Sequence, residues 1–181
     1  MKKFAVLMSA LCMLLCIAPQ LKAQDADDDV PERLKYFKEK YIETYKAPFD
    51  VVWNAIKENL AALPANVATE KYSQTDEGLY KGMIRSDNYV FCEGSDTTYR
   101  TLQKYQYDMK FIPGSVWENG RLEYKFILKE IEPEVVEMTM TTKMSGHESH
   151  VTSIVHFFKS NGLLEKDFLD KLAARIKAAQ E

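Results

Sequence analysis

The stretch GHESH at 146–150 raises the question of a metal site, because it places two histidines around a glutamate and His156 follows closely. Zinc proteases need two histidines four residues apart on a helix, where both imidazoles share one face. His147 and His150 are three apart in a predicted turn-to-strand segment, where they would point to opposite sides. His150 and His156 would share a strand face but lie about 20 Å apart, at about 3.3 Å per residue. We therefore predict no metal site and no cofactor.

Nucleophilic catalysis has no recognisable signature in this sequence. There is no G-x-S-x-G segment, and Cys92 in YVFCEG has no nearby histidine to activate it. The glycines are scattered at turns and form no phosphate-binding loop. The residues therefore predict a protein without catalytic residues. Cys92 is either a buried small apolar side chain or an exposed thiol able to pair with a partner.

Aromatic residues on two predicted strands are the better candidates for function. Their alternation places side chains on one shared face, where phenol hydroxyls in an apolar wall could orient an amphipathic ligand. The alternative is that these residues form the ordinary core face of a sheet. The candidate ligand contacts are Tyr105, Tyr107, Met109, Phe111, Tyr124 and Phe126. Trp117 lies in GSVWENG, a predicted turn, and is either tucked onto the sheet edge or presented to a partner.

Two amphipathic helices are predicted to position these side chains. The first begins at Pro48, which suits an initial helical turn, and ends near Pro64. Its apolar residues recur at spacings of three, four and seven, so Trp53 is interpreted as a core anchor. The second covers 161–181, with Leu164, Phe168, Leu172 and Ile176 on one side.

Strand patterns fill the rest of the chain. They predict strands at 40–46, 99–112, 120–132, 135–144 and 149–158, and a hairpin over 68–86 around the turn TDEG. Residues 35–181 therefore form a single α+β domain. We expect a curved antiparallel sheet of about six to seven strands, packed against the N-terminal amphipathic helix and a long C-terminal helix.

The N-terminus has the pattern of a secretory signal peptide over residues 1–23. MKK provides positive charge, Phe4–Ala18 is an apolar run too short for a membrane span, and Ala23 is a small residue at a plausible cleavage point. Residues 24–34 then form an acidic leader that is predicted to be solvated. The product is expected to be soluble in the periplasm or outside the cell.

The two cysteines inside the signal peptide do not predict a lipid anchor. Leucine precedes both Cys12 and Cys16, whereas a lipoprotein signal needs a small residue there. Removal of the signal peptide would lower the formal charge from −3 to about −6. This balance predicts no basic stripe and no nucleic-acid partner. No further apolar run is long enough to span a membrane.

The order of elements and the residues Ala47, Pro48, Val52 and Trp53 resemble the helix-grip superfamily, which includes START and Bet v 1-like proteins. That resemblance implies a sheet wrapped around the C-terminal helix with an apolar cavity between them. The chain lacks the second short helix usual in that superfamily. It also resembles small secreted envelope domains with a TATA-binding-protein-like fold, such as the repeats of the assembly lipoprotein BamC, which act by contact.

Two functions follow from these resemblances. The first is an exported non-catalytic protein that binds an apolar or amphipathic small molecule in a cavity between the sheet and the C-terminal helix. The alternative is a cell-envelope accessory protein for assembly or secretion, which acts by protein–protein contact and has no ligand cavity.

Overall fold

The computed structural model of this chain describes residues 34–94, 97–108 and 112–181. The predicted signal peptide lies outside these residues, as do residues 24–33 of the predicted acidic leader. Within the described part, the elements follow in the order β1 (Tyr41–Lys46), α1 (Phe49–Ala61), β2 (Val67–Gln74), β3 (Tyr80–Ser86), β4 (Tyr89–Glu93), α2 (Thr98–Tyr105), β5 (Trp117–Glu132), β6 (Val135–Glu148), β7 (Ile154–Phe158) and α3 (Leu163–Ala178).

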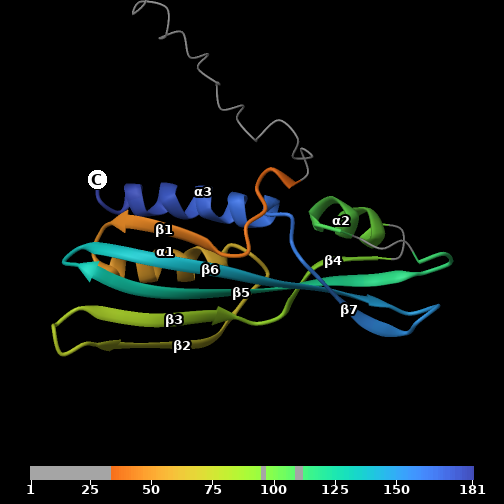
Figure 1. Cartoon of the computed structure of the whole chain (residues 1–181), viewed down its shortest axis with the longest axis horizontal. Helices are drawn as coiled ribbons and strands as arrows, with labels where there is room; N and C mark the ends of the chain where they lie inside the picture. The colour runs from red at the N-terminus through yellow and green to blue at the C-terminus, as the bar shows by residue number, and fades with distance from the viewer. Residues whose placement is uncertain (1–33, 95–96, 109–111) are drawn as a thin grey trace, which may run out of the picture. The chain divides into compact units, whose positions relative to one another are not determined.

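The strands form one antiparallel sheet built around the two longest of them, β5 and β6, which have 16 and 14 residues. At one end the order is β1-β6-β5-β3-β2, and at the other end β4 pairs with β5 and β7 pairs with β6. Figure 1 shows α3 running beside β1, and α2 near β4. The predicted fold class, α+β with an antiparallel sheet, is confirmed.

The sheet has two different faces, because alternate residues of a strand point to opposite sides. On β5, Leu122, Tyr124, Phe126 and Leu128 are buried, whereas Arg121, Ile127 and Lys129 are exposed. We call the first side the covered face, since the helices pack on it. The second side is the open face, which no helix of the described residues covers.

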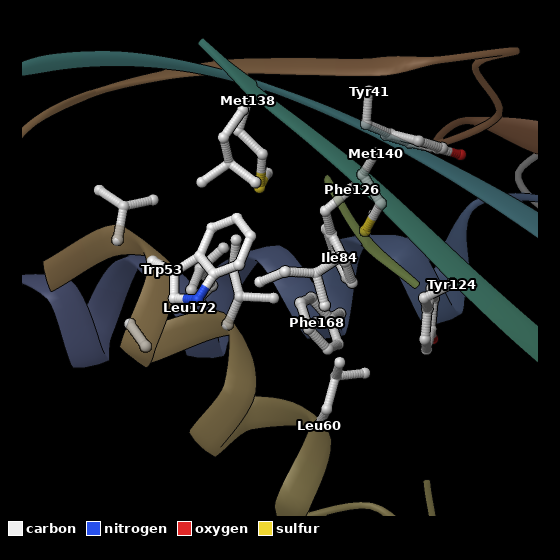
Figure 2. Packing of buried hydrophobic residues seen from close by; sticks show 14 of the residues in the cluster. Tyr41, Trp53, Leu60, Ile84, Tyr124, Phe126, Met138, Met140, Phe168 and Leu172 are labelled. Atoms are coloured by element: carbon white, nitrogen blue, oxygen red, sulfur yellow. The ribbon is translucent and has the colours of Figure 1, made fainter. Parts of the chain in front are cut away.

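The main core lies between the covered face and helices α1 and α3. Figure 2 shows Met138, Met140 and Phe126 pointing from the sheet toward Phe168 and Leu172 of α3. The rings of Phe126 and Phe168 stack with centroids 5.1 Å apart. Burial of one such side chain stabilises a fold by about 1.5–3 kcal/mol. This apolar cluster therefore fixes both helices on the sheet.

Helix α1 buries Trp53, which is 6 % exposed, so this residue is a core anchor as predicted. A buried polar contact also joins α1 to α3. The Nδ2 of Asn59 donates to the Phe168 carbonyl at 2.9 Å, and Nε of Arg175 donates to Oδ1 of Asn59 at 3.3 Å. Because Asn59 is 3 % exposed, these bonds satisfy an amide that would be costly to bury alone.

The predicted strand over 99–112 is wrong, because Thr98–Tyr105 forms helix α2. Thr98 and Leu102, four residues apart, are its buried side chains and face the sheet. Below them Gly120 pairs with Gly146. A Cβ at either glycine would lie 2.9 Å from a methyl carbon of Leu102. The paired glycines therefore leave the space that lets a helix rest on this end of the sheet, a tertiary effect that outweighs local alternation.

The segment predicted as a strand over 149–158 begins its strand later, at Ile154. The reason is Glu148, a buried carboxylate at the end of β6. Its oxygens accept the backbone N–H groups of His150 at 2.7 Å, Val151 at 2.8 Å and Thr152 at 2.5 Å. Burial alone would raise the pKa of Glu148, but the Thr152 hydroxyl and these N–H groups outweigh it and hold the pKa far below its usual range. The loop is thus wrapped around an ionised carboxylate.

Candidate binding site

An open groove of about 900 Å³ lies where α1 meets the hairpin of β2 and β3. Its walls are four aromatic rings, which we call the aromatic groove: Phe49, Trp53, Tyr72 and Tyr80. Phe49 and Trp53 are four residues apart and therefore share one side of α1. Tyr72 of β2 and Tyr80 of β3 point to the covered face, beyond the edge of the helix. The groove therefore forms where the strands extend past the helix that covers them.

Gly82 of β3 allows this arrangement. A Cβ at this position would lie 2.5 Å from Cζ3 of Trp53 and 2.8 Å from Cβ of Tyr72, both closer than real contacts permit. The absence of a side chain lets the indole ring approach the strand closely. Glycine is the only residue type that leaves this space, so Gly82 allows the close packing of Trp53 and Tyr72, two of the four rings.

The rings contact one another in stacked and edge-on pairs. Phe49 stacks on Trp53 with centroids 5.5 Å apart and on Tyr80 at 5.4 Å, while Trp53 meets Tyr72 edge-on at 5.3 Å. Such pairs stabilise each other by about 0.5–1.5 kcal/mol beyond their buried area. Tyr72 remains 63 % exposed. The cluster thus holds Tyr72 and Tyr80 in place while leaving ring surface accessible.

The rim of the groove carries four carboxylates, Asp50, Glu70, Glu130 and Glu134, against the ammonium group of Lys57. Lys57 pairs with Glu70 at 2.9 Å. The oxygens of Glu130 accept the backbone N–H of Tyr80 at 2.9 Å and of Glu134 at 3.2 Å, which fixes the position of this carboxylate. The groove therefore combines aromatic surface with an excess of negative charge.

The predicted ligand contacts are not brought together as one wall. Tyr105 is the last residue of α2, and Tyr107 follows that helix with its ring 4.4 Å from that of Phe37. Met109 and Phe111 lie outside the described residues. Tyr124 and Phe126 lie on the covered face of β5, as their alternation predicted, and belong to the main core.

A second pocket of about 450 Å³ lies beside α3, and Tyr124 contributes to its wall together with Tyr89 and Phe168. Burial raises the pKa of Tyr89 to about 12 and that of Tyr124 well above its usual range. Both phenols therefore stay protonated near neutral pH and can donate hydrogen bonds. Among the candidates from the sequence, Tyr124 is thus the one that combines a pocket wall with a polar group.

Trp117 is not in the predicted turn, and of its two alternative roles, tucked onto the sheet edge or presented to a partner, its burial fits the first. It begins β5, is 1 % exposed and donates from Nε1 to the Ser115 hydroxyl at 3.0 Å. Its ring packs against Phe158 with centroids 5.6 Å apart. Trp117 therefore anchors a second, smaller core beneath α2.

The histidines of this region have separate hydrogen-bond partners. His147 Nδ1 is 2.9 Å from a carboxylate oxygen of Glu118, and His156 Nε2 is 2.8 Å from the Thr152 hydroxyl. In the part of the chain that the structure describes, no three His, Cys, Asp or Glu side chains gather as metal ligands. Cys92 is half-buried, and burial raises the pKa of its thiol.

Comparisons with protein-family models, with curated proteins and with solved structures give no match to this chain. Its resemblances to the helix-grip superfamily and to secreted envelope domains therefore stay predictions. None of the helices in the described ranges is both long and apolar enough to cross a lipid bilayer.

Proposed function

We propose that this protein is an exported, non-catalytic binding protein that holds an amphipathic small molecule in the aromatic groove. The observation that carries the proposal is the accessible ring surface of Tyr72 and Tyr80 inside a groove of about 900 Å³. That volume lies within the range of small-molecule sites, about 300–1,000 Å³. This placement differs from the cavity expected between the sheet and the C-terminal helix, a space that Phe126 and Phe168 help to fill.

The rim restricts the chemistry of the ligand. Carboxylates accept hydrogen bonds and donate none, so the polar end of the ligand must carry donors or positive charge. Aromatic faces attract both apolar groups and cations. We infer a ligand with an apolar chain or ring and a neutral or cationic polar end. The residue types in the groove supply binding and orientation, rather than a nucleophile paired with a base.

A calorimetric titration tests this function directly. The probe is dodecyltrimethylammonium, used below its micelle concentration, and dodecyl sulfate provides the same chain with the opposite charge. We expect saturable binding of the cation and weaker binding of the anion. Tyr72→Ala and Tyr80→Ala should each weaken binding of the cation about five- to tenfold, because each removes about 1–1.4 kcal/mol of cation–ring attraction.

Phe157→Ala is the matched control, because Phe157 is a 79 % exposed aromatic residue on β7, away from the groove. Its binding curve should equal that of the unchanged protein. The proposal fails if no saturable site is found, or if the tyrosine variants bind as the unchanged protein does.

Export is the second part of the proposal, supported by the signal-peptide pattern at the N-terminus. Expression with the natural N-terminus, followed by intact-mass measurement of the exported fraction, should show a chain that begins near Gln24. A chain that keeps Met1 and stays with the cytoplasm would overturn it.

A second candidate function is contact with another envelope protein through β7. Within the described residues this short strand pairs with β6 alone, and Ile154, Val155 and Phe157 are exposed on it. An unpaired strand edge with apolar side chains can receive a strand of a partner. Crosslinking from position 157 in the native envelope should then trap a second protein, and recovery of the monomer alone would count against contact.

A further inference from the structure

The open face of the sheet carries an unexpected concentration of positive charge. Pairing between β2, β3 and β5 places five cationic side chains on it, and two acidic residues, Glu123 of β5 and Glu137 of β6, share this side. They are Lys71, Lys81, Arg85, Lys125 and Lys129. We call this group the basic patch. It lies on a chain whose formal net charge is −3, so positive charge exceeds negative charge on this face although the whole chain is acidic.

The basic patch contains two pairs of like charges directly opposite each other. Lys81 faces Lys129, and Arg85 faces Lys125. Like charges at directly opposed positions destabilise an antiparallel pair of strands. No carboxylate of the described residues lies within ion-pair distance, 4.0 Å, of these four side chains. Glu137 faces Lys129 across the strands and Glu123 lies two residues from Lys125 on the same side, so these charges are offset in part. An anionic partner would relieve the repulsion that remains.

An apolar strip runs between these two charged pairs. Met83 faces Ile127 on the adjacent strand, and Ile127 faces Thr139, which in turn faces Ile42 of β1. Ile127 is 47 % exposed and Ile42 is 56 % exposed. A depression of about 530 Å³ on this strip is lined by apolar and cationic side chains together, including Lys81 and Lys129. Apolar and cationic side chains thus line the same depression.

We propose that the open face docks on the surface of an anionic lipid bilayer. A bilayer interface accepts cations at its headgroups and apolar side chains just below them, so it matches both parts of this surface. A soluble polyanion such as a nucleic acid or an acidic polysaccharide would satisfy the charges but not the strip of Met83, Ile127 and Ile42. Docking by this face leaves the aromatic groove, on the covered face, pointing away from the membrane.

Vesicle co-sedimentation tests the proposal on the exported protein. Vesicles of phosphatidylcholine alone are compared with vesicles that contain phosphatidylglycerol. We expect binding to the anionic vesicles only, decreasing as salt is added. Each cation removed from the patch should weaken binding about fivefold. Any apolar N-terminal segment that remained on the chain would bind both kinds of vesicle, so the difference between them isolates the patch.

Lys81→Gln with Lys129→Gln is the informative variant. It should weaken vesicle binding about 25-fold, as two factors of about five, and should raise the thermal midpoint because it removes a repulsive pair. A gain in stability together with a loss of binding excludes misfolding as the cause. The matched control is Lys104→Gln with Lys177→Gln, which removes the same charge from exposed positions on α2 and α3.

Ile127→Thr tests the apolar strip, since it keeps the β-branched shape and the charge but replaces the ethyl group of an exposed side chain with a hydroxyl. It should also reduce vesicle binding, by about two- to fourfold for the apolar surface lost. Equal binding to neutral vesicles, equal effects of the control variant, or binding to heparin without binding to anionic vesicles would each overturn the proposal.

Discussion

The packing of α2 on the sheet can be tested by substituting Gly146, which lies beneath Leu102. A Cβ at Gly146 would lie 2.9 Å from Cδ1 of Leu102 and 3.1 Å from a ring carbon of Trp117, whereas ordinary contacts begin near 3.4 Å. Overpacking of this kind costs about 1–3 kcal/mol. Gly146→Ala should therefore lower the free energy of unfolding by that amount, or the thermal midpoint by roughly 2–12 °C.

The double variant Gly146→Ala with Leu102→Ala separates this explanation from a general intolerance of β-strand substitution. Leu102→Ala alone should cost about 2–5 kcal/mol, because it empties a fully buried position. Once the leucine methyl groups are gone, the new Cβ loses its closest clash, so the double variant should be more stable than the sum of the single changes by about 1–2 kcal/mol.

Urea unfolding followed by circular dichroism measures the four members of this cycle. Gly82→Ala combined with Leu102→Ala is the control, because Gly82 faces Trp53 at the other end of β5 and its effect should add to that of Leu102 without coupling. Strict additivity of the changes in unfolding free energy at Gly146 and Leu102 would refute this explanation of how α2 packs on the sheet.

Three further changes test other parts of the fold. Glu148→Gln should destabilise the protein at neutral pH. Because folding lowers the pKa of Glu148, the stability that this carboxylate contributes is present above about pH 4.3 and is lost as the pH falls. The thermal midpoint of the variant, measured from pH 7 to 2, should therefore fall less with acidification than that of the unchanged protein. Asn59→Leu should lower stability by about 1–3 kcal/mol in urea, because it removes the side-chain bonds to the Phe168 carbonyl and from Arg175, and an unchanged midpoint would contradict those contacts. Tyr41→Phe should cost about 1 kcal/mol through loss of the bond to the Tyr36 carbonyl, and should remove one phenol that titrates at about 12 from the absorbance curve at 295 nm.

The strands and their buried side were predictable from the sequence where one face of the sheet is exposed to water and the other is covered by helices. On β5 every second residue from Leu122 to Leu128 is apolar and buried, and this alternation is a local property of the sequence. Helix α2 was not predictable in the same way. Its residues alternate in polarity but also place Thr98 and Leu102 at helical spacing, and the choice between the two periods depends on Gly120 and Gly146, which are distant in sequence.

The candidate site was only partly visible in the sequence. The pair Phe49 and Trp53 has helical spacing, and Tyr72 and Tyr80 belong to a predicted hairpin, but their meeting depends on the contact at Gly82. Charge was misleading for a related reason. The net charge predicted no basic stripe, yet strand register gathers five cations of three strands on one face, against the two carboxylates of Glu123 and Glu137.

The most direct test of the proposed function is a ¹H–¹⁵N correlation spectrum of the protein during titration with dodecyltrimethylammonium. Trp53 and Trp117 give the indole signals, and Trp117→Phe assigns them. We predict that the Trp53 indole signal and the backbone signals of Tyr72, Tyr80 and Gly82 shift together and saturate, while the Trp117 signal stays in place. Shifts confined to the pocket beside α3, or spread evenly over the chain, would contradict a binding site in the aromatic groove.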